Sequence, residues 1–288
     1  MTPTEIKKIL TILGSHANKR LGQHFLIDEK VLETIVQTAD IKPGDLVLEV
    51  GPGLGVLTRA LLEKGAEVIA IEQDKRFVDY LKTTSYILHP TSLQIIHGDA
   101  ATVHWHELIG EREWKFVSNL PYSITSLALR KALWAPKPPE NLVVLVQREV
   151  GERAIEVAES KVESRKSKVK KGKTSLLSLM VALASASARI VRRMPAGCFY
   201  PAPKVESVIL QIVPMPWAER VKRRGIHPDK IMELAKKGFA HPRKLLKSNL
   251  QLTADSFQLT ELGVNEKARA EDLSVKQWAE LTKLIQNS

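Results

Sequence analysis

The sequence predicts an α/β protein in which a doubly wound, mostly parallel sheet is followed by a small all-α domain. Two observations carry this prediction. Apolar strand-like runs alternate with helical patterns between residues 46 and 147, which is typical of a parallel sheet with crossover helices. Beyond the turn Pro214-Met215-Pro216 the pattern is helical and contains no comparable strand. With 288 residues and 44% hydrophobic residues, the chain can bury one ordinary core and a smaller one.

The elements can be expected in chain order. Residues 1–27 contain a short amphipathic helix and then a basic arm, and Asp28 can cap a helix that runs to about Ala39. The turn Pro43-Gly44-Asp45 leads into the first strand. Strands are expected at 46–50, 67–72, 93–97, 115–118 and 141–147, and a closing antiparallel pair at 188–192 and 204–213. The expected domains are therefore the helix and arm of 1–27, a Rossmann-like domain over 28–214 and a helical domain over 215–288.

Charge and cysteine content restrict the partners. Lys and Arg number 43 against 32 Asp and Glu, a net charge of +11, which favours a polyanionic partner: nucleic acid first, an anionic membrane surface second. No apolar run is long enough to span a bilayer and the N-terminal segment lacks the features of a signal peptide, so we expect a cytoplasmic protein. The single Cys198 excludes an intramolecular disulfide and a multi-cysteine zinc site, and we expect no metal.

The stretch Asn119-Leu120-Pro121-Tyr122 follows a predicted strand, at the edge where open α/β sheets bind ligands. An Asn carbonyl accepts hydrogen bonds from an amine, Pro fixes φ in the turn, and a Tyr ring can stack on a base. The stretch therefore suits an amino group on a nucleobase. Taken by itself, such a stretch is more often a plain turn after a buried strand.

A glycine-rich turn and two acids occupy the corresponding ends of earlier strands. Gly51-Pro52-Gly53-Leu54-Gly55 opens a helix after the first strand, and Glu72 ends the second strand about twenty residues on, where a carboxylate can accept ribose hydroxyls. A nicotinamide cofactor fits these two features equally well. Asp99, after the third strand, supplies another carboxylate that suits an adenine amine, and this favours S-adenosylmethionine. The alternatives are an exposed strand-end acid for Glu72 and a turn cap for Asp99.

The order of these motifs resembles that of the ribosomal RNA adenine dimethyltransferases. The resemblance covers nearly the whole chain and is close to the KsgA-type enzymes, because Leu120 stands where the erythromycin-resistance relatives typically carry Ile. It implies a Rossmann-like class I S-adenosylmethionine-dependent methyltransferase domain and a small all-α RNA-binding domain. The motifs are Gly22-Gln23-His24-Phe25-Leu26, Glu49-Val50-Gly51-Pro52-Gly53-Leu54-Gly55, Ile71-Glu72, Gly98-Asp99-Ala100, Asn119–Tyr122 and Phe199-Tyr200-Pro201-Ala202-Pro203-Lys204-Val205-Glu206-Ser207.

The resemblance also implies residue roles. The side-chain oxygen of Asn119 and the main-chain carbonyl of Leu120 would accept the hydrogens of the adenine N6, with no conventional general base. Pro121 would brace the turn, Tyr122 would stack on one face of the extruded adenine, and Phe199 could cover the other face or simply be core. The implied S-adenosylmethionine contacts are His24, Leu26, Gly51, Glu72, Asp99 and Asn119.

The implied substrate is a pair of adjacent adenosines in the 3′-terminal hairpin loop of small-subunit ribosomal RNA, each dimethylated at N6, with a role in subunit biogenesis. A loop is suitable because its bases unstack at low cost. We expect a monomer that binds the small-subunit RNA or its precursor and no membrane. The candidate phosphate-binding residues are Lys19, Arg20, Arg220, Lys222, Arg223, Arg224, Arg243, Lys244 and Lys247, although each can also be an ordinary solvated charge.

One segment departs from the family pattern. Residues 164–173 form a basic insertion that either is a solvated loop or contacts RNA phosphates. Its Gly172-Lys173-Thr174 is not a Walker loop, because Ser167 stands where that pattern requires Gly. Two other function classes remain as alternatives: a non-catalytic RNA-binding factor with this fold, and a nicotinamide-dependent oxidoreductase.

Overall fold

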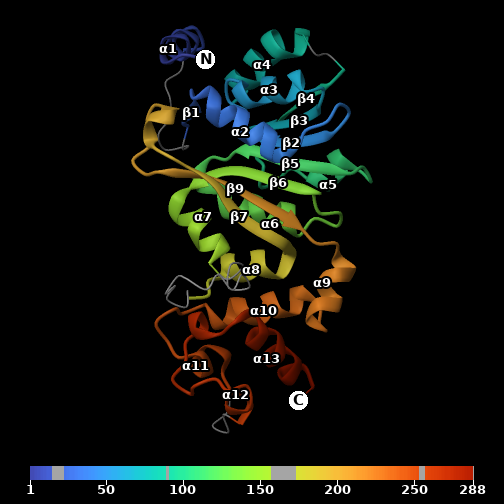
Figure 1. The fold of residues 1–288 in the computed structure, drawn as a ribbon, viewed down its shortest axis with the longest axis vertical. Coiled ribbons are helices and arrows are strands. Elements are labelled where there is room, and N and C mark those ends of the chain that lie inside the picture. The colour runs from blue at the N-terminus through green and yellow to red at the C-terminus, as the bar shows by residue number, and fades with distance from the viewer. Residues whose placement is uncertain (15–22, 89–90, 157–172, 253–256, 288) are drawn as a thin grey trace. The chain divides into compact units, whose positions relative to one another are not determined.

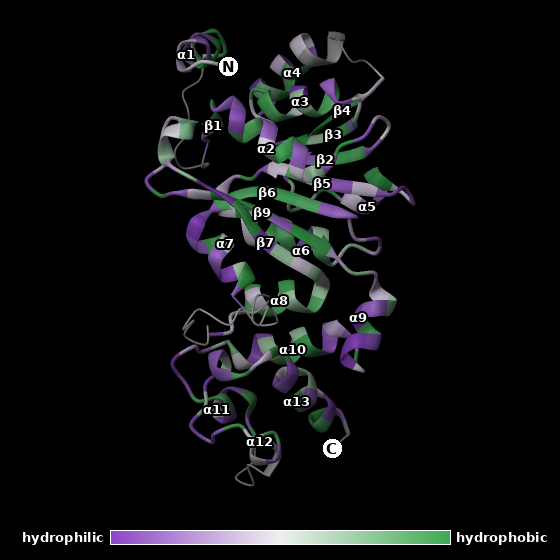
Figure 2. Cartoon of the chain, in the orientation of Figure 1, coloured by the Kyte–Doolittle hydropathy of each residue, from purple (hydrophilic) through white to green (hydrophobic). Residues whose placement is uncertain are grey.

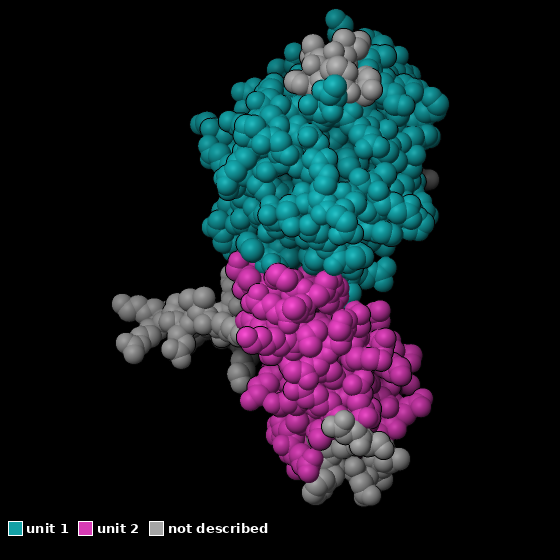
Figure 3. Space-filling model, turned by 90° about the vertical axis from the view of Figure 1, so that its right-hand side faces the viewer, with its two compact units in different colours: residues 1–151, 189–214 teal, residues 152–188, 215–288 magenta. Residues whose placement is uncertain are grey.

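The computed structural model describes residues 1–14, 23–88, 91–156, 173–252 and 257–287. The chain forms two compact units, which Figure 3 shows in different colours. The first comprises residues 1–151 and 189–214, and the second comprises residues 152–188 and 215–288. The second unit therefore includes an internal segment, 152–188, in addition to the C-terminal segment that the sequence suggested.

The first unit is built on a seven-stranded sheet with the order β4-β3-β2-β5-β6-β9-β7 (Figure 1). The five strands from β4 to β6 run parallel, and β9 pairs with β6 in the antiparallel direction. The predicted doubly wound parallel sheet is confirmed. The strands are β2 (Leu46–Val50), β3 (Glu67–Glu72), β4 (Leu93–His97), β5 (Trp114–Asn119), β6 (Asn141–Gln147), β7 (Ser185–Met194) and β9 (Ser207–Pro214).

Helices follow most of these strands. The Asp28 cap is as expected, because its carboxylate accepts the N–H of Val31 at 3.1 Å at the start of α2. Likewise Thr2 and Glu5 form a capping box at the start of α1. The helices that lie wholly or partly in this unit are α1 (Pro3–Ile12), α2 (Glu29–Ala39), α3 (Val56–Glu63), α4 (Lys75–Leu88), α5 (Trp105–Ile109), the 3₁₀ turn η2 (Tyr122–Ile124), α6 (Thr125–Leu133), α7 (Arg148–Ile155) and the 3₁₀ turn η4 (Ala196–Cys198).

The central strands are hydrophobic along most of their length, as Figure 2 shows for β6. Every residue of β2 is buried, and one core cluster includes Val47, Val117 and Val143 from three neighbouring strands. A second cluster contains Ile6 and Leu10 of α1 together with Phe77 of α4. Complete burial of such a side chain contributes about 1.5–3 kcal/mol, so these contacts stabilise the position of α1 on the unit.

A two-stranded ribbon ties the N-terminal arm to the later part of the unit. β1 (Phe25–Leu26) pairs antiparallel with β8 (Phe199–Tyr200), and Leu26 lies opposite Phe199. The N–H of Ile27 adds a hydrogen bond of 2.9 Å to the carbonyl of Cys198. The arm is thereby placed beside the FYPAP segment that begins at Phe199.

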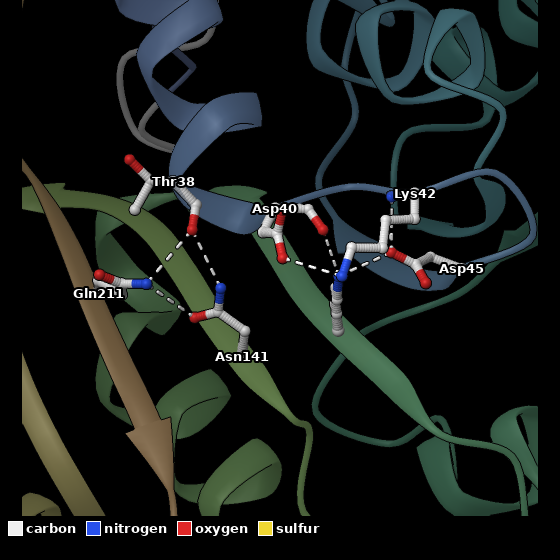
Figure 4. A network of polar contacts seen from close by, with 7 residues as sticks. Thr38, Asp40, Lys42, Asp45, Asn141 and Gln211 are labelled. Atoms are coloured by element: carbon white, nitrogen blue, oxygen red, sulfur yellow. Dashed lines mark hydrogen bonds and ion pairs between the residues drawn. The ribbon is translucent and has the colours of Figure 1, made fainter.

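Polar contacts gather at the amino ends of β5 and β6 (Figure 4). The ammonium of Lys115, a side chain only 8% exposed, contacts the carboxylate of Asp45 at 2.7 Å and the carbonyl of Asp40 at 2.5 Å. The amide of Asn141 donates to the carbonyl of Thr38 at 3.0 Å. These contacts join the end of α2 to the sheet, at the edge away from the carboxyl ends of the strands.

The second unit is helical. Its helix α8 was not predicted, because the run from Leu176 to Ala184 is apolar on nearly every side and therefore lacks a helical period. Helix α10 packs against α8, α11 and α13, and Trp278 of α13 is fully buried. The elements are α8 (Leu176–Ala184), α9 (Trp217–Arg224), α10 (Pro228–Gly238), α11 (Leu246–Leu250), α12 (Phe257–Glu261), the 3₁₀ turn η5 (Ala270–Asp272) and α13 (Val275–Asn287). No helix among the described residues is long and apolar enough to cross a bilayer.

Candidate active site

A cavity of about 450 Å³ lies at the carboxyl ends of β2 to β5, all within the first unit. The strands β2 and β5 are neighbours in the sheet but not in sequence, which makes this the point where the strand order reverses. Ligands of open α/β sheets bind at such points. The cavity is lined by these residues predicted from the sequence: His24, Leu26, Gly51, Glu72, Asp99, Asn119, Leu120, Pro121 and Tyr122.

The glycine turn after β2 forms one wall. Gly51 has φ +71° and Gly53 has φ +55°, and both conformations are in the left-handed region that favours glycine. A Cβ on Gly51 would lie 3.1 Å from the ring of Pro121, and one on Gly53 would lie 3.1 Å from the ring of Phe25. The two glycines therefore let the turn approach both the Asn119–Tyr122 segment and the arm.

Glu72, at the end of β3, is a buried residue with 7% of its surface exposed. Its carboxylate accepts the N–H of Gly53 at 3.0 Å and the N–H of Asp74 at 2.9 Å. Burial raises the pKa of Glu72, while the hydrogen bonds from Asp74 and Gly53 act in the opposite direction. These contacts fix the carboxylate at the cavity wall, with acceptor positions left for hydroxyl groups.

Glu49 also lines the cavity, and sequence reasoning gave it no role. It is 1% exposed and accepts the hydroxyl of Thr58 at 2.6 Å. Burial raises its pKa to about 8, the bond from Thr58 opposes this, and the nearby Glu72 adds to it. The sequence does contain one indication that Glu49 has a role, because it is a charged residue inside the otherwise apolar run Leu46–Val50. His97 and Asp74 line the cavity as well.

The side chain of Asn119 is held by the N-terminal arm. Its Nδ2 donates to the main-chain carbonyl of His24 at 3.0 Å. Because Nδ2 is engaged there, the planar amide turns its oxygen away from that carbonyl. The atom suited to accept a hydrogen from a ligand is thus oriented by a residue 95 positions earlier in the chain.

Tyr122 is fixed at both ends. Its hydroxyl lies 2.7 Å from the hydroxyl of Ser207, and its ring centroid lies 5.5 Å from that of His24, with the planes inclined by 30°. The Nδ1 of His24 lies 2.7 Å from the carbonyl of Pro201, an acceptor, so this nitrogen carries the proton. Burial raises the pKa of Tyr122, against the effect of the bond to Ser207.

Of the two alternatives that the sequence leaves open for Phe199, stacking on the base or packing in the core, the structure favours the core. Its side chain is 3% exposed and belongs to the core cluster that includes Leu26 and Ile209. The reason lies in the β1–β8 ribbon, where Phe199 is paired with Leu26 and faces the core. Its ring is part of the support of the arm.

The expectation for Arg220 is corrected, because it is fully buried and cannot bind a phosphate at the surface. Its Nε donates to the carbonyl of Met215 at 2.7 Å, and its guanidinium lies 4.5 Å from the ring centroid of Trp217. Burial lowers the pKa of Arg220 to about 10. Arg223 and Arg224 also donate to main-chain carbonyls within the second unit, those of Ser185 and Ala182.

The other predicted cations differ in exposure. Lys222, Arg243 and Lys244 are exposed, whereas Lys247 is half-buried. Lys19 and Arg20 lie outside the described residues, as does the basic insertion except for Lys173, which pairs with Glu271.

The sheet thus carries a glycine turn after β2, an acid at the end of β3 and another just after β4, around the point where the strand order reverses. Two solved structures are similar in fold at 23% identity: a dimethyladenosine transferase from Plasmodium falciparum (TM-score 0.68, covering 92% of this chain and 98% of that one) and the 23S rRNA methyltransferase ErmE (TM-score 0.63, covering 91% and 99%).

The family model for ribosomal RNA adenine dimethylases matches residues 14–287. Proteins called ribosomal RNA small subunit methyltransferase A are 37% identical over 272 residues in Dehalococcoides mccartyi (92% of this chain, 87% of that protein) and 32% identical over 299 residues in Alkaliphilus metalliredigens (99% and 97%). The chain belongs to the ribosomal RNA adenine dimethylase family. It is an enzyme that uses S-adenosylmethionine as methyl donor and dimethylates adenine in ribosomal RNA.

Proposed function

We propose that the enzyme dimethylates N6 of two adjacent adenosines in the 3′-terminal hairpin loop of small-subunit ribosomal RNA, acting as a cytoplasmic monomer during subunit biogenesis. Support for the small subunit comes from the relatives named above and from Leu120, which stands where resistance enzymes acting on large-subunit RNA typically carry Ile. The observation that carries the proposal is the convergence of Glu72, Asp99 and the Asn119–Tyr122 turn on one cavity.

The residues of the cavity fit S-adenosylmethionine. The fixed carboxylate of Glu72 is suited to accept the ribose hydroxyls, and Asp99 is suited to accept the amine of the cofactor's adenine. The close approach at Gly51 and Gly53 leaves main chain, and no side chain, facing the ligand there. When bound, the cofactor supplies a methyl group on a positively charged sulfur, which is already strongly electrophilic.

The protein's task is then to place the target nitrogen and keep its lone pair available. The Asn119 oxygen, turned by the bond from Nδ2 to His24, and the carbonyl of Leu120 would accept the two amine hydrogens. Both acceptors favour a pyramidal nitrogen and stabilise the positive charge that develops on it as it takes the methyl group. The proton then leaves to solvent, and the monomethylated amine, with one hydrogen left, uses one of the two acceptors.

Tyr122 is the stacking surface for the extruded adenine. Its ring is held by Ser207 and by the ring of His24, so little side-chain entropy remains to be lost when a base stacks on it. Stacking on an aromatic ring contributes about 1–3 kcal/mol per base. With Phe199 in the core, we assign base stacking to Tyr122 alone among the residues predicted for it.

The exposed cations of the second unit would bind the flanking phosphates. Lys222, Arg243 and Lys244 are exposed and suited to this role, and Lys247 is partly so. Arg220 is excluded by its burial. Lys19, Arg20 and the insertion 164–173 remain candidates from the sequence.

Incubation with labelled S-adenosylmethionine and undermethylated small subunits, followed by mapping of the label, tests this proposal. We expect label at two adjacent adenosines of the 3′-terminal hairpin loop. Label in large-subunit RNA would instead assign the chain to the resistance branch. Asn119→Ala should abolish transfer and leave RNA binding largely unchanged.

A further inference from the structure

In the loop that follows β4, successive main-chain N–H groups donate hydrogen bonds to the same residue, Asp99. The carboxylate of Asp99 accepts the N–H of Ala101 at 2.8 Å, and its main-chain carbonyl accepts those of Thr102 and Val103, each at 3.0 Å. The loop thus curls around the residue proposed to bind the cofactor's adenine. Its carbonyls consequently point to the other side, where they need donors of their own.

A single lysine of α6 supplies those donors. The ammonium of Lys131 donates to the carbonyls of Ala100, Ala101 and Val103 at 2.8, 2.9 and 2.7 Å. Three N–H donors therefore meet three acceptors, which matches the full donor capacity of an ammonium group. The same group lies 5.2 Å from the ring centroid of Trp105, whose Nε1 also donates to Ala100 at 3.1 Å.

The position of Lys131 connects two parts of the cavity. Helix α6 begins at Thr125, directly after the turn Tyr122–Ile124, and these turn residues line the cavity. Lys131 lies on the same helix, six residues beyond its start. One rigid element thus carries the target-base turn at its amino end and holds the loop of Asp99 near its carboxyl end.

We propose that Lys131 is a positioning residue that keeps the Asp99 loop in the shape that binds the adenine of S-adenosylmethionine, and so sets the preference of the enzyme for adenine in its cofactor. This inference rests on the proposed placement of that adenine at Asp99. Lys131 does not line the cavity and acts through the loop. Without its ammonium, the carbonyls of Ala101 and Val103 lose this donor and that of Ala100 keeps only the indole of Trp105, so the loop can relax away from the cavity.

The test compares binding of S-adenosylhomocysteine with that of S-inosylhomocysteine, in which an oxygen replaces the adenine amine. A carboxylate at Asp99 accepts a hydrogen from the amine and repels the oxygen, so the wild-type protein should prefer adenine. For Lys131→Met we expect the Kd of the adenine compound to rise about tenfold and that of the inosine compound to change less than about twofold. The KM for S-adenosylmethionine should rise similarly, while kcat at saturation stays within about twofold.

Lys137→Met is the matched control. Lys137 also holds a loop, through the carbonyl of Glu111 at 2.6 Å and the carboxylate of Glu113 at 2.7 Å, but its partners do not line the cavity. This variant should keep the wild-type preference for adenine. A purely structural effect of losing a lysine would appear in both variants and would overturn the inference.

Asp99→Ala separates failure of the inference from failure of the placement. If Asp99→Ala retains the preference for adenine, the adenine does not lie at Asp99 and the placement is wrong. If Asp99→Ala loses the preference and Lys131→Met keeps it, the placement stands and the role of Lys131 is refuted. Should Lys131→Met fail to fold, Lys131→Gln replaces it: the Gln side chain is shorter and has only two N–H donors for the three carbonyls, so the preference for adenine should fall, and a preference equal to that of the wild type would refute the role.

Discussion

Replacement of Glu49 by Gln should stabilise the protein, and by an amount that depends on pH. The carboxyl of Glu49 is fully buried, and its pKa rises from 4.5 to about 8. At pH 7 the unfolded chain is ionised at this position while the folded protein holds the proton, so folding must take up a proton. The free-energy cost of this proton uptake follows from the gap of about 2.5 units between the unfolded pKa and pH 7. At about 1.36 kcal/mol per unit, it is about 3 kcal/mol.

The pKa of Glu49 is higher in the folded protein than in the unfolded chain. Its contribution to the free energy of unfolding is therefore fully present below about pH 4.5 and is lost as pH rises through about 8. Gln resembles the neutral carboxyl, keeps an oxygen for the hydroxyl of Thr58 and has no proton to lose. Glu49→Gln should therefore be about 3 kcal/mol more stable than the wild type at pH 7 and less than about 1 kcal/mol more stable at pH 5.

Thermal unfolding at pH 5, 7 and 8.5 measures this difference. Each kcal/mol corresponds to about 2–4 °C in Tm for a domain of 150–250 residues, so the variant should unfold several degrees higher at pH 7. Glu63→Gln, on the exposed face of α3, is the matched control and should follow the wild type at every pH. An equal Tm difference at all three pH values would show that the proton uptake does not occur at Glu49.

Other predictions concern catalysis and RNA binding. Asn119→Asp keeps an acceptor oxygen but loses the N–H donated to His24, so its methyl-transfer rate should lie below that of the wild type but stay measurable, whereas Asn119→Ala should abolish transfer. Equal rates for the two variants would remove the acceptor role. Ser207→Ala should lower kcat/KM about fivefold through loss of one hydrogen bond to Tyr122, and adding Tyr122→Phe should cost little more. Arg243→Gln combined with Lys244→Gln should reduce the slope of log affinity against log salt by about 1.4, measured with the substrate RNA, and an unchanged slope would place the phosphates elsewhere.

The parallel sheet could be predicted because its strands are short apolar runs bounded by turn residues, and periodicity is informative for such segments. Helix α8 could not, since its residues from Leu176 to Ala184 are apolar around the whole circumference. The structure places its capping box at Ser175 and Ser178, a local signal that propensity alone does not reveal.

For the site, residues that end strands could be located from sequence, because strand ends in a parallel sheet meet at one edge. Glu72 and Asp99 belong to this group. The orientation of side chains could not be predicted, since it depends on contacts between distant segments. Phe199 turns to the core because it pairs with Leu26, and Arg220 is buried beside Trp217. The roles of the other site residues remain predictions.

The polar contacts around Lys115 have a consequence for how this protein can vary. They fasten the amino ends of β5 and β6, whereas the cavity lies at the carboxyl ends of the strands. Substitutions at Asp45 or Asn141 should therefore change how tightly the sheet is held without changing what the enzyme recognises. Residues at the amino ends of the strands can therefore vary with the stability that a given temperature or salt concentration requires, whereas residues at the carboxyl ends are constrained by catalysis.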